Sequence, residues 1–263
     1  MTEDAIRIDR ADPAIPIVTI DRPERRNSMS LAMWRRLATV FEDLAADEEA
    51  RVVILTGAGG FFCAGADISE FKAVRSGPED GAVYEQAVRS CGQAIERLPK
   101  ATVAAISGFC IGGGFGLAQV CDFRIADVTA SFAIPAARLG IVYNSHECQT
   151  LLNLVGLAQA KRILFGAERF DAAEAERIGF VDRMAGEGEG ALAAARSFAA
   201  GMAGNAPLTI SGVKLILNAL AAGEVERQAD DIAAAGNAAL ASEDYQEGIR
   251  AFAEKRSPVF RGR

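Results

Sequence analysis

The sequence lacks the features of membrane and secreted proteins. No apolar run in its 263 residues approaches the roughly 20 residues that a membrane-spanning helix needs. The N-terminal segment MTEDAIRIDRADPAIPIVTID is acidic and has neither the basic nor the apolar part of a signal peptide. The five cysteines form no CxxC pair, which indicates free thiols rather than a zinc site or a disulfide framework. We therefore expect a cytoplasmic protein with no metal site and no membrane contact.

An excess of positive charge is also missing. The formal net charge is −7 at pH 7, and Lys and Arg are mixed with Asp and Glu. Without a basic stripe the chain has nothing to follow a phosphate backbone, so nucleic acid is excluded as a partner. With 50% hydrophobic residues, 263 residues can bury one large core, either alone or with an appendage.

Strand and helix signals alternate along the first half of the chain. Apolar patterns indicate strands over 14–21, 51–57, 102–108, 122–126 and 131–134, with helices over 30–46, 77–99 and 113–120. Ser30 is the expected N-cap of the first helix. Beyond Asn144 the segments are helical: 145–155, 158–164, 171–178, 190–204, 207–222, 225–241 and 242–255. This predicts an α/β core over residues 1–200 and a helical C-terminal region over 201–263.

The last helix has an apolar stripe of Ile249, Phe252 and Ala253. Such a stripe needs a cover, which is either this chain or another subunit.

A glycine cluster, GFCIGGGFGLAQVCDFRIA (108–126), directly follows the strand over 102–108. A Walker loop is excluded because the required lysine is missing. A dinucleotide loop fits RVVILTGAGGFF (51–62) better, but Phe62 occupies its third glycine position. The remaining interpretation is a strand-to-helix junction whose free N–H groups point at a ligand oxygen, as in an oxyanion hole. A second donor loop is then needed, and FFCAGADISEF (61–71) is suitable.

Four segments together resemble the crotonase (enoyl-CoA hydratase/isomerase) superfamily: FCAGADI, AAISGFCIGGGFGLAQVCDFRIA, SFAIPAARLGI and EDYQEGIRAFAEKRSPVF. The resemblance runs from about Arg22 to the C-terminus. It implies a crotonase-like core of repeated ββα units, a helical C-terminal trimerisation region, and a homotrimer or homohexamer. It also implies an acyl-CoA substrate, with coenzyme A as part of that substrate and no separate cofactor. The enolate would be stabilised by two backbone amides, which fall on Ala66 and Gly113.

The same resemblance implies where coenzyme A binds. It places the CoA portion of the substrate beside residues 64–68 and beside the segment RPERRN (22–27). The arginines of that segment could bind a phosphate of CoA. For Asp67 the alternative is a helix N-cap, and for Gly112 and Gly114 it is close packing. The residues expected at the substrate are Arg25, Arg26, Ala64, Asp67, Ile68, Gly112, Phe252 and Lys255.

The carboxylates that hydratases of this superfamily use are missing. Gly116, Ala136 and Asn144 stand at the three positions where members carry acidic residues. The neighbouring segment GIVYNSHECQTL offers three ionisable replacements: Tyr143, His146 and Glu147. The alternative is structural, with Ser145 capping a helix, Glu147 favouring its positive end and His146 solvated.

The expected function is therefore an acyl-CoA reaction of the hydratase/isomerase type with replaced acid and base groups. A second hypothesis is decarboxylation, because LGxxYN (139–144) resembles methylmalonyl-CoA decarboxylases and loss of CO₂ forms the enolate without a base. A third is a protein that binds CoA thioesters without turnover.

Overall fold

The structure, a computed structural model, describes residues 5–70 and 78–263 and has two sheets. The larger sheet has the order β1-β2-β3-β4-β6-β9, in which only the β1–β2 pair is antiparallel. Its strands are β1 (Ile6–Asp9), β2 (Ile17–Ile20), β3 (Val52–Gly57), β4 (Ala101–Ile106), β6 (Phe123–Ala126) and β9 (Arg183–Met184). The smaller sheet, in the order β5-β7-β8, contains β5 (Phe109–Ile111), β7 (Ser131–Ala133) and β8 (Phe170–Asp171).

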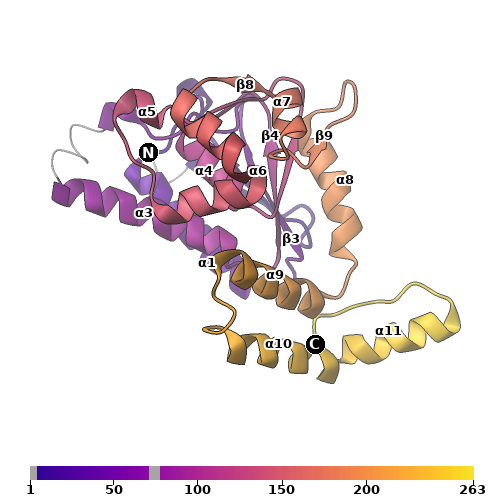
Figure 1. The fold of residues 1–263 in the computed structure, drawn as a ribbon. Helices are drawn as coiled ribbons and strands as arrows, with labels where there is room; N and C mark the ends of the chain where they lie inside the picture. The colour runs from indigo at the N-terminus through magenta and orange to yellow at the C-terminus, as the bar shows by residue number, and fades with distance from the viewer. Residues whose placement is uncertain (1–4, 71–77) are drawn as a thin grey trace.

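Helices cover both faces of the larger sheet (Figure 1). The α-helices of the described residues are α1 (Leu31–Ala46), α3 (Pro78–Glu96), α4 (Gly113–Val120), α5 (Ala136–Leu139), α6 (Ser145–Gly166), α7 (Ala172–Arg177), α8 (Ala191–Ala203), α9 (Pro207–Ala222), α10 (Ala229–Ala241) and α11 (Glu243–Glu254). Two 3₁₀ helices are η2 (Pro23–Arg25) and η3 (Ile68–Glu70). The expected α/β core with a helical C-terminal region is confirmed.

The position of strand β3 in the sheet explains why residues 52–55 form a continuous apolar run. Val53 and Leu55 belong to the core on the α1 and α3 side, whereas Val52 and Ile54 belong to the core against α8. All four side chains are fully buried. Successive residues of a strand point to opposite faces, so a strand covered on both faces has no polar positions.

Two expectations are wrong, one about the segment that precedes the glycine cluster and one about the cap of α6. The glycine cluster does not follow β4 directly, because β5 lies between β4 and Gly112. Ser145 does not cap α6; instead the Asn144 side chain accepts a hydrogen bond from the Glu147 amide at 3.0 Å, and the Glu147 carboxylate accepts one from the Asn144 amide at 3.3 Å. The predicted helices over 145–155 and 158–164 meet at Gly156, whose φ of 74° kinks α6. Ser30 does cap α1, since its hydroxyl accepts from the Met33 amide at 3.2 Å.

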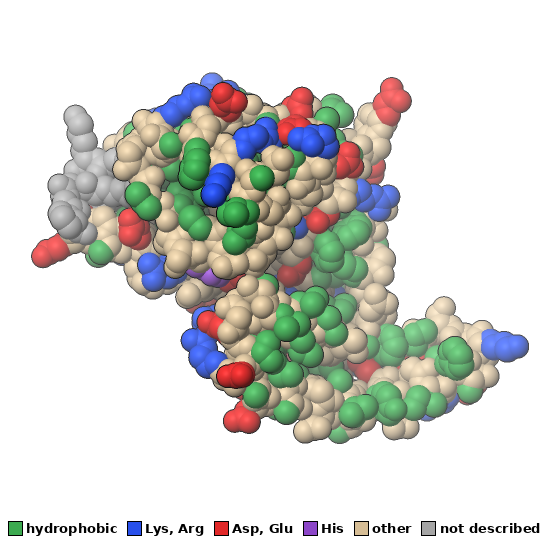
Figure 2. All heavy atoms as spheres, viewed as in Figure 1, with side chains coloured by type: hydrophobic (Ala, Val, Ile, Leu, Met, Phe, Trp, Pro, Cys, Tyr) green, Lys and Arg blue, Asp and Glu red, His purple; other side chains and the backbone are tan. Residues whose placement is uncertain are grey.

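The last helices form an arm that extends below the body (Figure 1). The predicted boundary after residue 200 falls inside α8, which packs on β3, β4 and β6, and the arm consists of α9 to α11. Large apolar side chains line its surface, as Figure 2 shows, and they include Leu240, Ile249 and Phe252 at 60%, 53% and 87% exposure. In the described ranges no helix is long and apolar enough to cross a bilayer.

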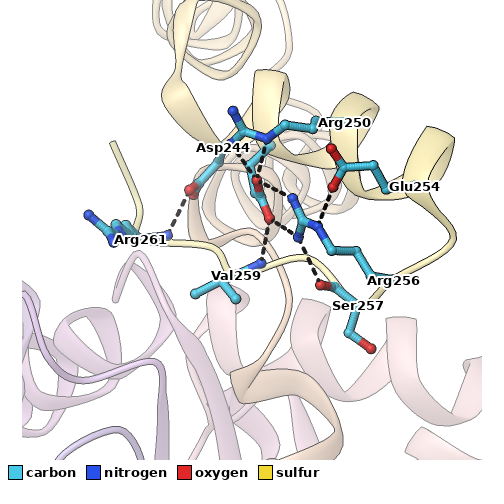
Figure 3. Close-up of polar contacts among 8 residues, drawn as sticks. Asp244, Arg250, Glu254, Arg256, Ser257, Val259 and Arg261 are labelled. Atoms are coloured by element: carbon cyan, nitrogen blue, oxygen red, sulfur yellow. Dashed lines mark hydrogen bonds and ion pairs between the residues drawn. The ribbon is translucent and has the colours of Figure 1, made fainter.

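The chain end folds back on α11 through buried carboxylates (Figure 3). Asp244 accepts hydrogen bonds from the Arg261 and Gly262 amides, both at 2.7 Å. Glu247 pairs with Arg250 and Arg256, each at 2.5 Å. The hydrogen bond from Arg256, followed by that from Arg250, holds the pKa of Glu247 far below its usual range. These contacts fix the chain end against the arm.

Candidate active site

Three glycines at the start of α4 are each required for a different reason. Gly112 has φ 54° and ψ −114°, a conformation that is open only to glycine. A Cβ on Gly113 would lie 2.9 Å from Cζ2 of Trp34, and one on Gly114 would overlap the Cys63 carbonyl oxygen. The expected packing role of Gly114 is thus confirmed, whereas Gly112 is needed for its backbone angles.

The second loop, residues 63–67, is held by backbone hydrogen bonds on both sides. On one side the Cys63 amide donates to the Phe109 carbonyl at 2.7 Å. On the other, the Met29 amide donates to Gly65 at 2.8 Å and the Asp67 amide donates to Met29 at 2.9 Å. Since amides along an extended chain point alternately to opposite sides, the intervening Ala66 amide faces away from Met29.

The Ala66 and Gly113 amides lie side by side. A Cβ on Gly113 would be 3.7 Å from the Ala66 nitrogen, and a Cβ on Gly65 would be 3.1 Å from the Gly113 nitrogen. Within residues 5–70 and 78–263, neither amide donates a hydrogen bond to another residue. Gly113 is the first residue of α4, where helix N–H groups have no partner in the helix and the dipole favours negative charge. This pair can therefore bind one electron-rich oxygen.

Asp67 is engaged within the loop itself. Its buried carboxylate accepts hydrogen bonds from the amide and hydroxyl of Ser69, at 3.0 and 2.6 Å, and pairs with Arg22 at 2.7 Å. Burial acts to raise the pKa of Asp67, but these hydrogen bonds outweigh it and the pKa lies below its usual value. The bond from the Ser69 amide is the kind of contact that the capping alternative requires, at the start of η3. Residues 71–77, into which this segment leads, lie outside the described residues.

The other expected CoA residues divide into two groups. Arg25, Arg26 and Ile68 are exposed near the loop, and the Ala64 amide donates to the Arg26 carbonyl at 3.0 Å, which joins RPERRN to residue 64. The Arg26 guanidinium lies 5.1 Å from the centre of the Phe109 ring. Helix α11, which carries Phe252 and leads to Lys255, lies apart from α4 in Figure 1, so a single chain does not bring the two groups together.

The three positions without carboxylates have different surroundings. Gly116 has no atom within 4 Å of the position that its Cβ would take. Ala136 is buried at the start of α5, and the preceding Pro135 ring lies 3.9 Å from the Cβ position of Gly112. Asn144 caps α6. Among the described residues, a side chain at Gly116 would therefore begin in open space.

The three candidate acid and base groups make contacts with other parts of the protein. His146 is 47% exposed and its Nε2 lies 3.1 Å from Oε2 of Glu96, a hydrogen bond that raises the pKa of His146 above its usual value. Glu147 belongs to the capping box, and burial raises its pKa. Tyr143 is half-buried and packs against the main core. His146 lines a cavity whose wall includes neither Ala66 nor Gly113.

Sequence reasoning missed Trp34, Arg22 and Gln119. Trp34 lies under Gly113 and donates from Nε1 to the Tyr84 hydroxyl at 2.8 Å. The helical spacing of α1 marks Trp34 as buried, but no sequence signal places it at the glycines. Gln119 is a buried polar residue in the otherwise apolar helix α4. That contrast is visible in the sequence and could have drawn attention to it.

Comparison with known proteins identifies the family of the chain. The family profile described as enoyl-CoA hydratase/isomerase matches residues 10–263. The chain belongs to this family. It is 32% identical to the peroxisomal Delta(3,5)-Delta(2,4)-dienoyl-CoA isomerase of Arabidopsis thaliana, over 95% of this chain and 93% of that protein. It is 34% identical to the short-chain-enoyl-CoA hydratase of Clostridium acetobutylicum, over 92% of each chain.

Solved structures of the family confirm the crotonase-type fold. The enoyl-CoA hydratase of Bacillus anthracis matches with a TM-score of 0.90 and 30% identity, over 98% of this chain and 100% of that one. The described part of this family member contains no group of three or more His, Cys, Asp or Glu side chains that could hold a metal.

Proposed function

We propose that this protein acts on acyl-CoA thioesters and stabilises the thioester enolate in an oxyanion hole made by the Ala66 and Gly113 amides. The main support is that these two N–H groups lie side by side and donate to no other described residue. Fixed donors aimed at a developing negative charge stabilise the transition state strongly. The start of α4 adds the favourable end of its dipole.

A reaction of the hydratase/isomerase type is the first candidate, since the relatives named above are hydratases and isomerases. It needs a proton donor and acceptor, and Gly116, Ala136 and Asn144 supply none. Tyr143, His146 and Glu147 are the proposed replacements.

Loss of CO₂ is the second candidate. It forms the enolate directly, so the two amides can act without a carboxylate base. The empty space at Gly116 and the use of Asn144 as a helix cap favour it. Tyr143 would then orient the departing carboxylate.

Coenzyme A is held, in this proposal, by the loop that contains Ala64 and Ile68 and by Arg25 or Arg26. Guanidinium groups bind phosphate in a bidentate manner. Phe252 and Lys255 would contribute from the arm of a neighbouring subunit, because the exposed apolar surface of the arm favours a homotrimer or homohexamer. We place this assembly in the cytoplasm and assign it no cofactor besides the CoA of its substrate.

Three acyl-CoA substrates distinguish the candidates: crotonyl-CoA, a 3-enoyl-CoA and methylmalonyl-CoA. Turnover is followed at the thioester ultraviolet band and by mass, and binding by the fluorescence of Trp34, the only tryptophan of the chain. Hydration of crotonyl-CoA or movement of the double bond supports the first candidate. Loss of the mass of one CO₂ molecule from methylmalonyl-CoA supports the second. If all three bind unchanged, the protein is a binder, and if none binds, the proposal is wrong.

A further inference from the structure

A cavity of about 610 Å³ lies at the end of α4 that is opposite Gly113. Its wall includes Gln119 and Val120 of α4, Glu96 of α3 and His146 of α6, and α9 closes another side. We call it the distal cavity. None of the groups assigned to the oxyanion hole lines it, so it needs a separate explanation.

Gln119 is the unusual residue of this wall. It is 3% exposed, and within the described part of the chain neither its Oε1 nor its Nε2 has a hydrogen-bond partner. Burying an unpaired amide is unfavourable, and nearly all buried polar groups in proteins are paired. An unpaired amide beside a cavity therefore points to a ligand group that donates to it and accepts from it.

The charged side chains of the wall do not call for a charged ligand. Each of them has a partner of opposite charge in the structure. The pairs are Glu96 with His146 at 3.1 Å, Asp122 with Lys214 at 2.7 Å, and Arg124 with Asp182 at 2.7 Å. A charged group entering the cavity would lose its hydration without gaining a free counter-ion. The wall thus favours a neutral polar group.

Helix α4 joins the distal cavity to the paired amides. Gln119 is six positions after Gly113, which is about 9 Å along the helix axis at 1.5 Å per residue. Gly116 lies between them and leaves open space. Residues three apart are neighbours on a helix, and side chains lean toward its N-terminus, so Gln119 extends toward the space beside Gly116. In the proposal below, an acyl chain with its thioester oxygen at the Gly113 amide passes Gly116 to Gln119.

We propose that the distal cavity receives the far end of the acyl chain and that Gln119 binds a neutral hydroxyl or amide group there. The substrate class is then a medium-length acyl-CoA with a polar, uncharged group near the end of the chain. This inference rests on the proposed function, because it needs a CoA thioester at the Gly113 amide.

The test is calorimetric binding of three saturated acyl-CoAs to the full chain. Nonanoyl-CoA and 8-hydroxyoctanoyl-CoA differ only by a terminal methyl or hydroxyl group, and butanoyl-CoA is too short to reach Gln119. We expect the wild type to bind the hydroxyl compound roughly five- to tenfold more tightly than nonanoyl-CoA, the effect of about one hydrogen bond. Gln119→Met should lose this preference and keep its affinity for butanoyl-CoA.

Gln149→Met is the matched control. Gln149 also lines the distal cavity, but its amide already donates to Asn153 at 2.8 Å, so this variant should keep the hydroxyl preference. Urea unfolding supplies a second measurement. Gln119→Met should raise the midpoint of the ligand-free protein because it removes an unpaired buried amide.

Three results would overturn the inference. They are equal binding of the two long compounds by the wild type, an unchanged preference in Gln119→Met, and a lower urea midpoint for that variant. If butanoyl-CoA also fails to bind, the proposed function falls as well. Binding of butanoyl-CoA without a hydroxyl preference overturns only the role of Gln119.

Discussion

The oxyanion hole can be tested by removing one N–H group without altering a side chain. Replacing Ala66 by lactic acid converts its amide into an ester and keeps the methyl group. Natural substitutions at Gly113 are a poorer test, because any Cβ there would lie 2.9 Å from Cζ2 of Trp34. The ester at Ala66 removes one donor and keeps every side chain, and it also weakens the Gly65 carbonyl, which accepts from the Met29 amide at 2.8 Å.

The expected magnitudes separate catalysis from stability. Since the Ala66 amide donates to no described residue, the ester should lower the free energy of unfolding only through the weakened Gly65 carbonyl, by less than about 1 kcal/mol. Loss of one oxyanion donor should lower kcat by about 10²–10³-fold, which corresponds to about 2.7–4 kcal/mol. The assay is kcat on the acyl-CoA that the wild type converts, together with urea unfolding of the same samples.

Lactic acid at Ala64 is the matched control. This amide belongs to the same loop but donates to the Arg26 carbonyl at 3.0 Å. Its ester likewise weakens a carbonyl, that of Cys63, which accepts from the Ile111 amide at 3.0 Å, and it loses the bond to Arg26 as well. It should therefore reduce the free energy of unfolding by about 1 kcal/mol more than the Ala66 ester does, and retain most of kcat. The reasoning is refuted if the two esters behave the other way round, or if the Ala66 ester keeps full kcat.

Two further predictions concern single interactions. The pKa of His146, the only histidine of the chain, should lie above 6.5 and fall in Glu96→Gln, as its NMR titration would show, and an unchanged pKa would contradict the pair. Because the pKa is raised on folding, the pair stabilises the fold fully below pH 6.5, and this contribution is lost as the pH rises through the folded-state pKa. Gly114→Ala should destabilise the fold by about 1–3 kcal/mol, because its methyl group meets the Cys63 carbonyl. Gly116→Ala, which meets nothing, should stabilise it by up to about 1 kcal/mol, and urea unfolding that finds the reverse order would be inconsistent with this packing.

Local signals predicted the fold where glycine, proline or a clear period marks an element. Helices α4 and α9 begin and end at the expected residues, because Gly113 and Pro207 open them. The missed strands β1, β5, β8 and β9 have two to four residues, too few for a clear period. The equally short β6 and β7 were predicted, so length alone does not explain the misses. Between the neighbours Asn144 and Ser145, only the hydrogen bond from the Glu147 amide decides which one caps α6.

The site was predicted less completely because its contacts join distant segments. The resemblance to the superfamily brought the Ala66 and Gly113 loops together, and the structure places their amides side by side. The pair of Asp67 with Arg22 joins residues 45 positions apart, and no local pattern indicates it. His146 was attractive as the sole histidine, but its partner Glu96 lies at the end of another helix.

Gly116 links the two proposals. Its neighbours in the glycine cluster are required by backbone angles or close contacts, whereas a methyl group at Gly116 would meet no atom within 4 Å. Alanine would favour the helix there by about 1 kcal/mol, so helix stability does not explain a glycine. What glycine provides is the space itself, one turn from the Gly113 amide and on the way to Gln119. In the two proposals, the residue that removes a carboxylate beside the Gly113 amide is also the one that leaves room for an acyl chain to reach the other end of α4.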